Sequence, residues 1–146
     1  MKFRWILFSL FFIFAQDMSA QTMKMLFAEM PDSLLPYIIK NRRLDCIDFV
    51  ENNMKAEIEN SFGGKSELLS LTDSTAEMKL SETSLLKLQL VSIPEKIIIF
   101  EKIISVPEKQ SFARYYNTDW KEVFLTEKQL LDVKKCLTAN EKFNLY

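Results

Sequence analysis

The spacing of apolar residues changes at Gly63 and Gly64, and this change constrains the fold more than any other feature. Before the glycine pair, apolar side chains recur every three or four residues from 23 to 53, as they do in amphipathic helices. After it, apolar and polar residues alternate, as in TAEMKL (75–80) and LLKLQLV (85–91). Alternation of this kind is typical of antiparallel strands with one buried face. The sequence therefore predicts an α+β fold, with N-terminal helices packed on a meandering antiparallel sheet.

Breaks in the helical spacing divide the N-terminal region into three predicted helices. The first is short and ends at Pro31, because the residue before a proline is disfavoured in helical geometry. The second runs from Asp32 to about Lys40, with the Asp32 carboxylate as its N-cap and Pro36 near the first turn. The third runs from Leu44 to about Asn53.

The remaining pattern predicts a row of strands followed by one helix. KIIIFEKIIS (96–105) is apolar on both faces and is expected in the interior of the sheet, and SFARYYNTDWKEVF (111–124) is expected as two strands joined at 117–119. A C-terminal helix is predicted over 126–137, opened by a capping box of Thr126 and Gln129. Residues 54–62 fit either an extension of the third helix or the first strand of a hairpin that turns at the glycine pair. The alternation of Ala56 and Ile58 with charged neighbours favours the strand.

The first twenty residues have the pattern of a secretory signal peptide. Lys2 and Arg4 precede an apolar run that is shorter than the ~20 residues needed to span a bilayer, and Ser19 and Ala20 close the segment. We therefore expect cleavage after Ala20 and one mature α+β domain over 21–146. The expected location is the periplasm or the inner face of the outer membrane, with no transmembrane segment after signal removal.

Composition removes several classes of function. The chain contains no histidine, which is the commonest general base and transition-metal ligand, so we predict no metal site and no catalytic residue. Its two glycines are adjacent, so they cannot form a phosphate loop or a dinucleotide fingerprint, and no cofactor is predicted. With 19 basic and 20 acidic residues, the chain lacks the basic excess typical of nucleic-acid binding.

The two cysteines leave two interpretations open. In an oxidising compartment, Cys46 and Cys136 could form one disulfide. Both residues also lie among aliphatic neighbours, where a free cysteine behaves as a small buried hydrophobe. We favour the second interpretation.

Two groups of residues are candidates for binding. Arg42 and Arg43 lie at a predicted helix junction, and the aromatic residues Tyr115, Tyr116 and Trp120 flank the predicted hairpin turn. Arginine, tyrosine and tryptophan are enriched in interface hot spots, so these residues suggest contact with another envelope protein. The alternative is that the arginines form a solvated junction and the aromatic side chains pack on neighbouring strands.

Two further functions are compatible with the sequence. Asp45 and Asp48 are three residues apart on a predicted helix and could serve a carboxylate-dependent hydrolase, which needs two acids in one concave pocket. A carrier of a small apolar ligand would need a cavity of at least ~300 Å³ between the helices and the sheet. A non-enzymatic binding or assembly module of the cell envelope remains the favoured prediction.

Four short motifs also resemble a known family. They are MPDSLLP (30–36), RLD (43–45), GGKS (63–66) and TDW (118–120), and they occur in the order seen in the domain of unknown function 3256 family of exported proteins from Bacteroides-type bacteria. The likeness covers the chain from Gln21 to about Glu122. It implies an exported protein and brings no established catalytic residues. Members of that family continue into further strand-forming sequence, so we expect a shortened member whose sheet exposes an edge strand.

Overall fold

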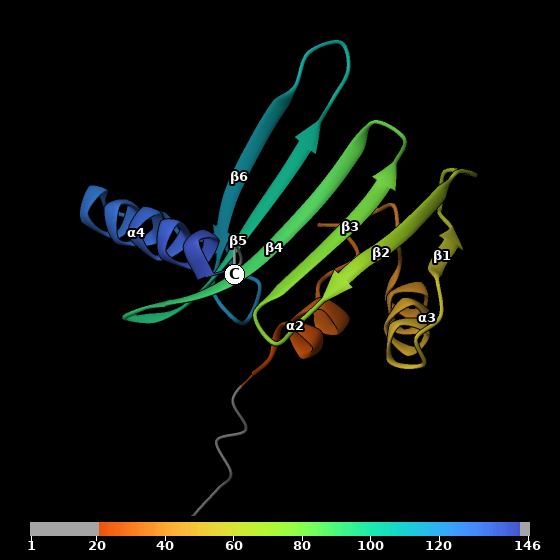
Figure 1. The fold of residues 1–146 in the computed structure, drawn as a ribbon, viewed down its shortest axis with the longest axis horizontal. Coiled ribbons are helices and arrows are strands. Elements are labelled where there is room, and N and C mark those ends of the chain that lie inside the picture. Colours follow the sequence, from red (N-terminus) through yellow and green to blue (C-terminus); the bar gives the residue numbers. More distant parts are fainter. Residues whose placement is uncertain (1–20, 144–146) are drawn as a thin grey trace, which may run out of the picture.

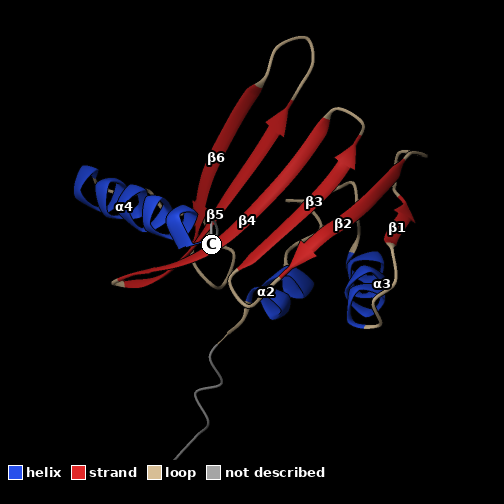
Figure 2. Cartoon of the chain, viewed as in Figure 1, coloured by secondary structure: helices blue, strands red, loops and turns tan. Residues whose placement is uncertain are grey.

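Between residues 21 and 143, six antiparallel strands form a simple meander that is flanked by three helices. The computed structural model describes residues 21–143, so the predicted signal peptide lies outside the described residues. The helices are α2 (Met23–Glu29), α3 (Lys40–Glu51) and α4 (Glu127–Phe143). The strands are β1 (Ala56–Glu59), β2 (Lys65–Leu71), β3 (Thr75–Ser81), β4 (Ser84–Ile93), β5 (Glu95–Ile104) and β6 (Gln110–Tyr116), and their order in the sheet is their order in the chain (Figures 1 and 2). The predicted α+β class is confirmed.

The larger hydrophobic core lies between one face of the sheet and the pair α2 and α3. Because side chains alternate along a strand, every second residue of β1 to β4 points to this face. α2 contributes Met23, Leu26 and Phe27, and α3 contributes Cys46 and Ile47. The strands contribute Ala56, Ile58, Leu68, Ala76, Met78, Leu80, Leu86, Leu88 and Ile98. We call this side of the sheet the helix face.

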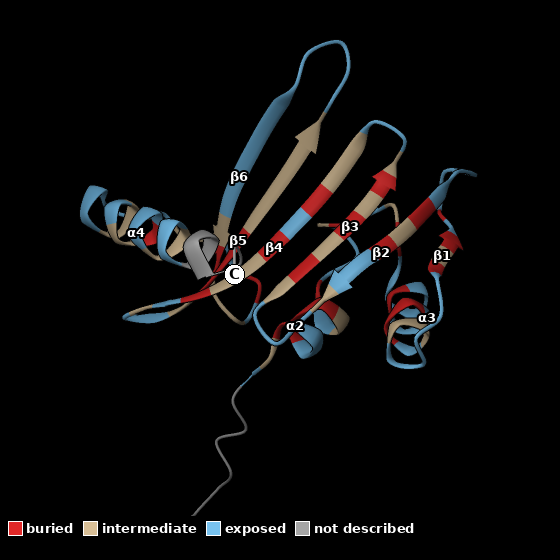
Figure 3. Cartoon of the chain, viewed as in Figure 1, coloured by how far each residue is buried: buried red, intermediate tan, exposed pale blue. Residues whose placement is uncertain are grey.

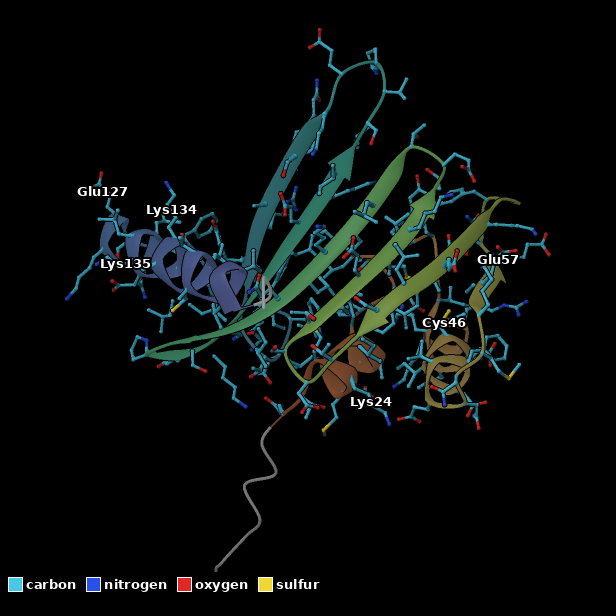
Figure 4. The ribbon with its side chains drawn as sticks, viewed as in Figure 1. Lys24, Cys46, Glu57, Glu127, Lys134 and Lys135 are labelled. Atoms are coloured by element: carbon cyan, nitrogen blue, oxygen red, sulfur yellow. The ribbon has the colours of Figure 1, made fainter. Side chains whose placement is uncertain are left out.

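The opposite side of the sheet carries charged side chains and one helix. α4 packs there through Val133, which joins Val91, Ile97 and Ile99 in a second, smaller cluster. Further along the same side, Glu57 on β1 accepts hydrogen bonds from Lys55 at 2.6 Å and from Lys65 at 2.7 Å (Figure 4). These hydrogen bonds lower the pKa of Glu57 to about 2. The helix face therefore carries the larger core, whereas the opposite face carries both the smaller cluster and solvated ion pairs.

The predicted second helix is wrong. Residues 31–39 form consecutive turns, with hydrogen bonds from the Leu35 amide to Asp32 O at 3.2 Å and from the Ile38 amide to Leu35 O at 3.1 Å. Pro36 has no amide hydrogen to donate, and it disfavours helical geometry at Leu35. α3 accordingly begins at Lys40, four residues before the predicted start. The N-cap position of α3 is Ile39, not Asp32. The Asp32 carboxylate nevertheless satisfies the first amide of this helix from the preceding turns, because its Oδ1 accepts the Lys40 amide at 2.8 Å.

The turn predicted at 117–119 is present, but the strand predicted after it is reduced to a single bridge. Tyr116 and Glu122 form one isolated β-bridge, and Trp120 adopts a φ of 60°, which a continuous strand does not allow. By contrast, the capping box at α4 is confirmed, since the Thr126 amide donates to Gln129 Oε1 at 2.9 Å. The ambiguous segment 54–62 contains β1 and leads into a turn at the glycine pair, where Gly63 has a φ of 75°, as the favoured interpretation required. None of the helices among residues 21–143 has the length and hydropathy needed to cross a membrane.

Candidate functional site

Arg43 is a core residue, so its predicted place on the surface is wrong. Its side chain has no solvent exposure, and its guanidinium group donates to the backbone oxygens of Phe27 at 3.0 Å and Ile38 at 2.6 Å, and to that of Met30. Nη1 also donates to Asp32 Oδ1 at 2.9 Å. A guanidinium group carries five donors in a fixed plane, so one side chain can satisfy carbonyls from several segments at once. Arg43 thereby ties the end of α2 and the 31–39 turns to α3.

The other predicted binding residues are divided among three environments. Arg42 is exposed, and its guanidinium lies 3.8 Å from the Asp45 carboxylate. Tyr116 and Trp120 are buried on the helix face, where the Trp120 indole donates to Leu26 O at 3.0 Å. Tyr115 points to the opposite side and packs against the smaller cluster. The structure therefore does not bring these five residues together in one surface.

Cys46 and Cys136 are both free. Cys46 lies on the buried side of α3, in the larger core (Figure 4). Burial raises the pKa of its thiol to about 11. Cys136 is half-buried on α4, which packs on the other side of the sheet. The two thiols therefore lie on elements that pack against opposite faces of the sheet.

A groove of about 670 Å³ lies on the helix face where β5 and β6 extend past the covering helices. The hairpin rises beyond its neighbours in Figure 1, and the outer half of β6 is exposed in Figure 3. Leu34 and Ser33 form one wall of the groove, and both belong to the turns held by Arg43. The floor consists mainly of alternate residues from the two strands: Phe100, Lys102, Ile104, Phe112, Arg114 and Tyr116. Ser111 and Ala113 of β6 also line the groove.

The charged side chains of the groove are both basic. Lys102 and Arg114 lie on neighbouring strands, where Phe100 pairs with Arg114 and Lys102 with Phe112. Lys102 Nζ also lies 5.2 Å above the ring of Tyr37, a cation–π distance. Neither cation forms an ion pair with a residue between 21 and 143. Two available cations beside aromatic rings suit a ligand that is anionic and partly apolar.

The sequence offered a weak signal for this groove. Phe112, Arg114 and Tyr116 are spaced by two and so share one face of β6. The face of β5 that carries Lys102 could not be predicted, because KIIIFEKIIS has apolar residues on both faces of the strand. The periodicity could not show that the helices stop short of the hairpin tip.

Comparison with known proteins places the chain in a family. A family model described as a protein of unknown function, DUF3256, matches residues 15–142. The chain belongs to this family. Among curated proteins, none matches the sequence.

The fold of this DUF3256 protein is similar to a solved structure described as a domain of an uncharacterized protein from Porphyromonas gingivalis W83. The TM-score is 0.59 and the sequence identity is 22%, over 70% of this chain and 54% of that chain. At this identity the likeness shows the fold alone. The DUF3256 chain also spans only about half of that structure's length.

The carboxylates weighed as catalytic groups lie apart from the groove of the DUF3256 protein. Asp45 and Asp48 are both exposed on α3, and Asp48 Oδ1 accepts a hydrogen bond from Asn52 at 3.2 Å. They do not converge in a concave site, which acid–base hydrolysis requires. Within residues 21–143, no three His, Cys, Asp or Glu residues are grouped closely enough to hold a metal ion.

Proposed function

We propose that this DUF3256 protein is an exported, non-enzymatic binding module of the cell envelope, and that the β5–β6 groove is its binding surface. The observation that carries the proposal is the pair of basic side chains, Lys102 and Arg114, which lie among the aromatic residues of a groove whose described lining contains no acidic residue. Charge-assisted hydrogen bonds from such cations, together with contact to aromatic faces, favour an anionic ligand with an apolar part. The pattern of residues 1–20 supports export.

The groove also has the dimensions expected of a binding site. Its volume exceeds the ~300 Å³ at which ligand pockets begin. Its rim is held in place, because Arg43 fixes the 31–39 turns against α2 and α3. A site whose walls are fixed before binding loses less free energy on ordering.

Titration with anilinonaphthalene sulfonate, a fluorescent dye that is both aromatic and anionic, tests the groove directly. We expect the variant Lys102→Gln/Arg114→Gln to bind the dye about tenfold more weakly than the wild type, since one hydrogen bond to a charged group contributes about 1.5 kcal/mol. The matched control is Lys121→Gln/Lys128→Gln, which removes two exposed cations outside the groove. Equal affinities for the wild type and the groove variant would refute the proposal.

A further inference from the structure

We propose that the partner of the groove is an extended polypeptide segment that pairs with the outer edge of β6, with acidic side chains on one side and apolar side chains on the other. This inference rests on the proposed binding function and names its partner class. Addition of a strand to an exposed sheet edge combines main-chain hydrogen bonds with pockets for alternate side chains.

The hydrogen bonds at the end of β6 show which of its backbone groups face outward. Tyr115 O accepts a hydrogen bond from the Val123 amide at 2.8 Å, and the Asn117 amide donates to Lys121 O at 2.9 Å. Val123 and Lys121 belong to the segment after the turn, so these groups of β6 face away from β5. The register between β5 and β6 is regular from Tyr116 back to Gln110. Outward-facing groups alternate along a strand, so the amides and carbonyls of Ser111 and Ala113 face away from β5. Residues 110–114 are exposed (Figure 3).

The two edges of the sheet differ in the protection they carry. β1 has four residues, and Glu57 near its centre is paired with Lys55 and Lys65. Short length and charge are common means of preventing edge pairing. β6 has seven residues, no proline and no register shift, and its central residues are Phe112, Ala113 and Arg114. Only the β6 edge therefore suits an added strand.

The spaces on the two sides of this edge differ in their lining: one carries two cations, and the other is mostly apolar. On the helix face, the added strand would lie beside Arg114 and Phe112 in the basic groove. On the other face, a second hollow of about 270 Å³ lies along β6, with Glu122 at its rim. Most of its lining is apolar, and consists of Ala113 and Tyr115 from β6, Val123, Phe124 and Leu125 from the segment after the turn, and Leu130 from α4. Arg114 lines this hollow as well as the groove.

In an added partner strand, successive side chains would point alternately into the groove and into the second hollow. Ala113 is small and lines the second hollow, which leaves room for larger side chains of a partner. Ser111 points to the same side of the sheet, where its hydroxyl donates to the Glu101 carboxylate. Phe124 is 92% exposed and is available to cover the partner's side chains. A partner strand with acidic residues at every second position would place carboxylates near Arg114 and apolar groups near Phe124. A second copy of β6 fits less well, because QSFARYY carries a cation and no acid.

Fluorescence anisotropy with a labelled, capped octapeptide of alternating Glu and Val tests the mode of binding. We expect Ala113→Pro to weaken binding by at least about tenfold, because proline removes an outward-facing amide without removing a bond to β5. Ala113→Ser retains that amide and serves as the matched control. The same peptide with N-methyl groups on alternate residues tests the hydrogen bonds independently of any change in folding. We expect it to bind at least about tenfold more weakly than the unmodified peptide.

The outcomes separate the two proposals. Strand addition is supported if both Ala113→Pro and backbone N-methylation weaken binding while Ala113→Ser does not. It is overturned if both changes leave the affinity unaltered while Lys102→Gln/Arg114→Gln abolishes binding, because the groove would then bind the peptide through its charges alone. Absence of peptide binding alongside specific dye binding also overturns strand addition and leaves the proposed function standing.

Discussion

At the scale of single residues, Arg43 is the side chain whose replacement should destabilise the fold most clearly. Lysine keeps the charge, but one ammonium group on α3 cannot reach the oxygens of α2, of Met30 and of the 31–39 turns together. We expect Arg43→Lys to lower the free energy of unfolding by about 2–3 kcal/mol, because buried carbonyls lose their donors. Urea denaturation measures this change.

The neighbouring residue provides the control for that experiment. Arg42 is exposed and has only a 3.8 Å contact with Asp45, so Arg42→Lys should change stability by no more than about 0.5 kcal/mol. Similar losses in the two variants would contradict a clamping role for Arg43.

Sequence alone treated Arg42 and Arg43 as one feature, although a helix places adjacent residues about 100° apart. Arg43 shares its face with Cys46 and Ile47, at spacings of three and four residues, and all three are buried. That spacing was visible in the sequence. A buried arginine is rare, however, and the carbonyls that make it possible come from segments up to 16 residues away. Such partners cannot be identified from local pattern.

At the scale of elements, prediction succeeded where one periodicity covered a whole segment. The strand at 75–81 alternates cleanly and pairs antiparallel with the strand at 84–93, as expected. Prediction was wrong at 32–40 and after Tyr116, where turns interrupt the pattern. Leu34, Leu35 and Ile38 have helical spacing, but they are brought to the core by two consecutive turns that the Arg43 contacts and Pro36 favour. Apolar spacing identifies which residues are buried more reliably than which element carries them.

The weak attachment of α4 gives a prediction for this helix. Val133 is its one buried hydrophobic residue among those whose side chains are described, and it contacts the smaller cluster. We expect Val133→Ala to speed amide hydrogen exchange in α4 while exchange in β3 and β4 stays slow, because these strands belong to the larger core. Hydrogen exchange with mass spectrometry resolves the segments.

Leu131 provides the comparison for Val133. It lies on the same helix and is 56% exposed, so Leu131→Ala should leave exchange in α4 nearly unchanged. Equal acceleration in α4, β3 and β4 after Val133→Ala would instead indicate that the two cores unfold as one unit.

At the scale of the whole molecule, uneven coverage of the sheet creates the candidate site. α2, α3 and the 31–39 turns cover one face up to β4, α4 covers part of the other, and the β5–β6 tip extends past both (Figure 2). Strand alternation could predict that Phe112 and Arg114 share a face. Coverage depends on helix length and on tertiary packing between distant segments, so the groove itself was not predictable.

The contacts of Gln21 and Met23 lead to a prediction of where the signal peptide is cleaved during export. Gln21 O accepts a hydrogen bond from Lys96 at 3.1 Å, the Met23 amide donates to Asp73 O at 2.7 Å, and Met23 is fully buried. Cleavage after Ala20 would therefore keep every one of these contacts. We expect mass spectrometry of the protein recovered from a bacterial envelope fraction to find Gln21 as its first residue.

Cleavage after Met23 would lower the stability of the fold. Removal of Met23 would leave a gap in the larger core beside Leu26 and Phe27, and loss of a buried methionine side chain costs about 2–5 kcal/mol. A chain that begins at Met1 in the cytoplasmic fraction would contradict export. A first residue beyond Met23 would contradict the assignment of the cleavage site, and it should be accompanied by a lower midpoint of thermal unfolding than that of the chain beginning at Gln21.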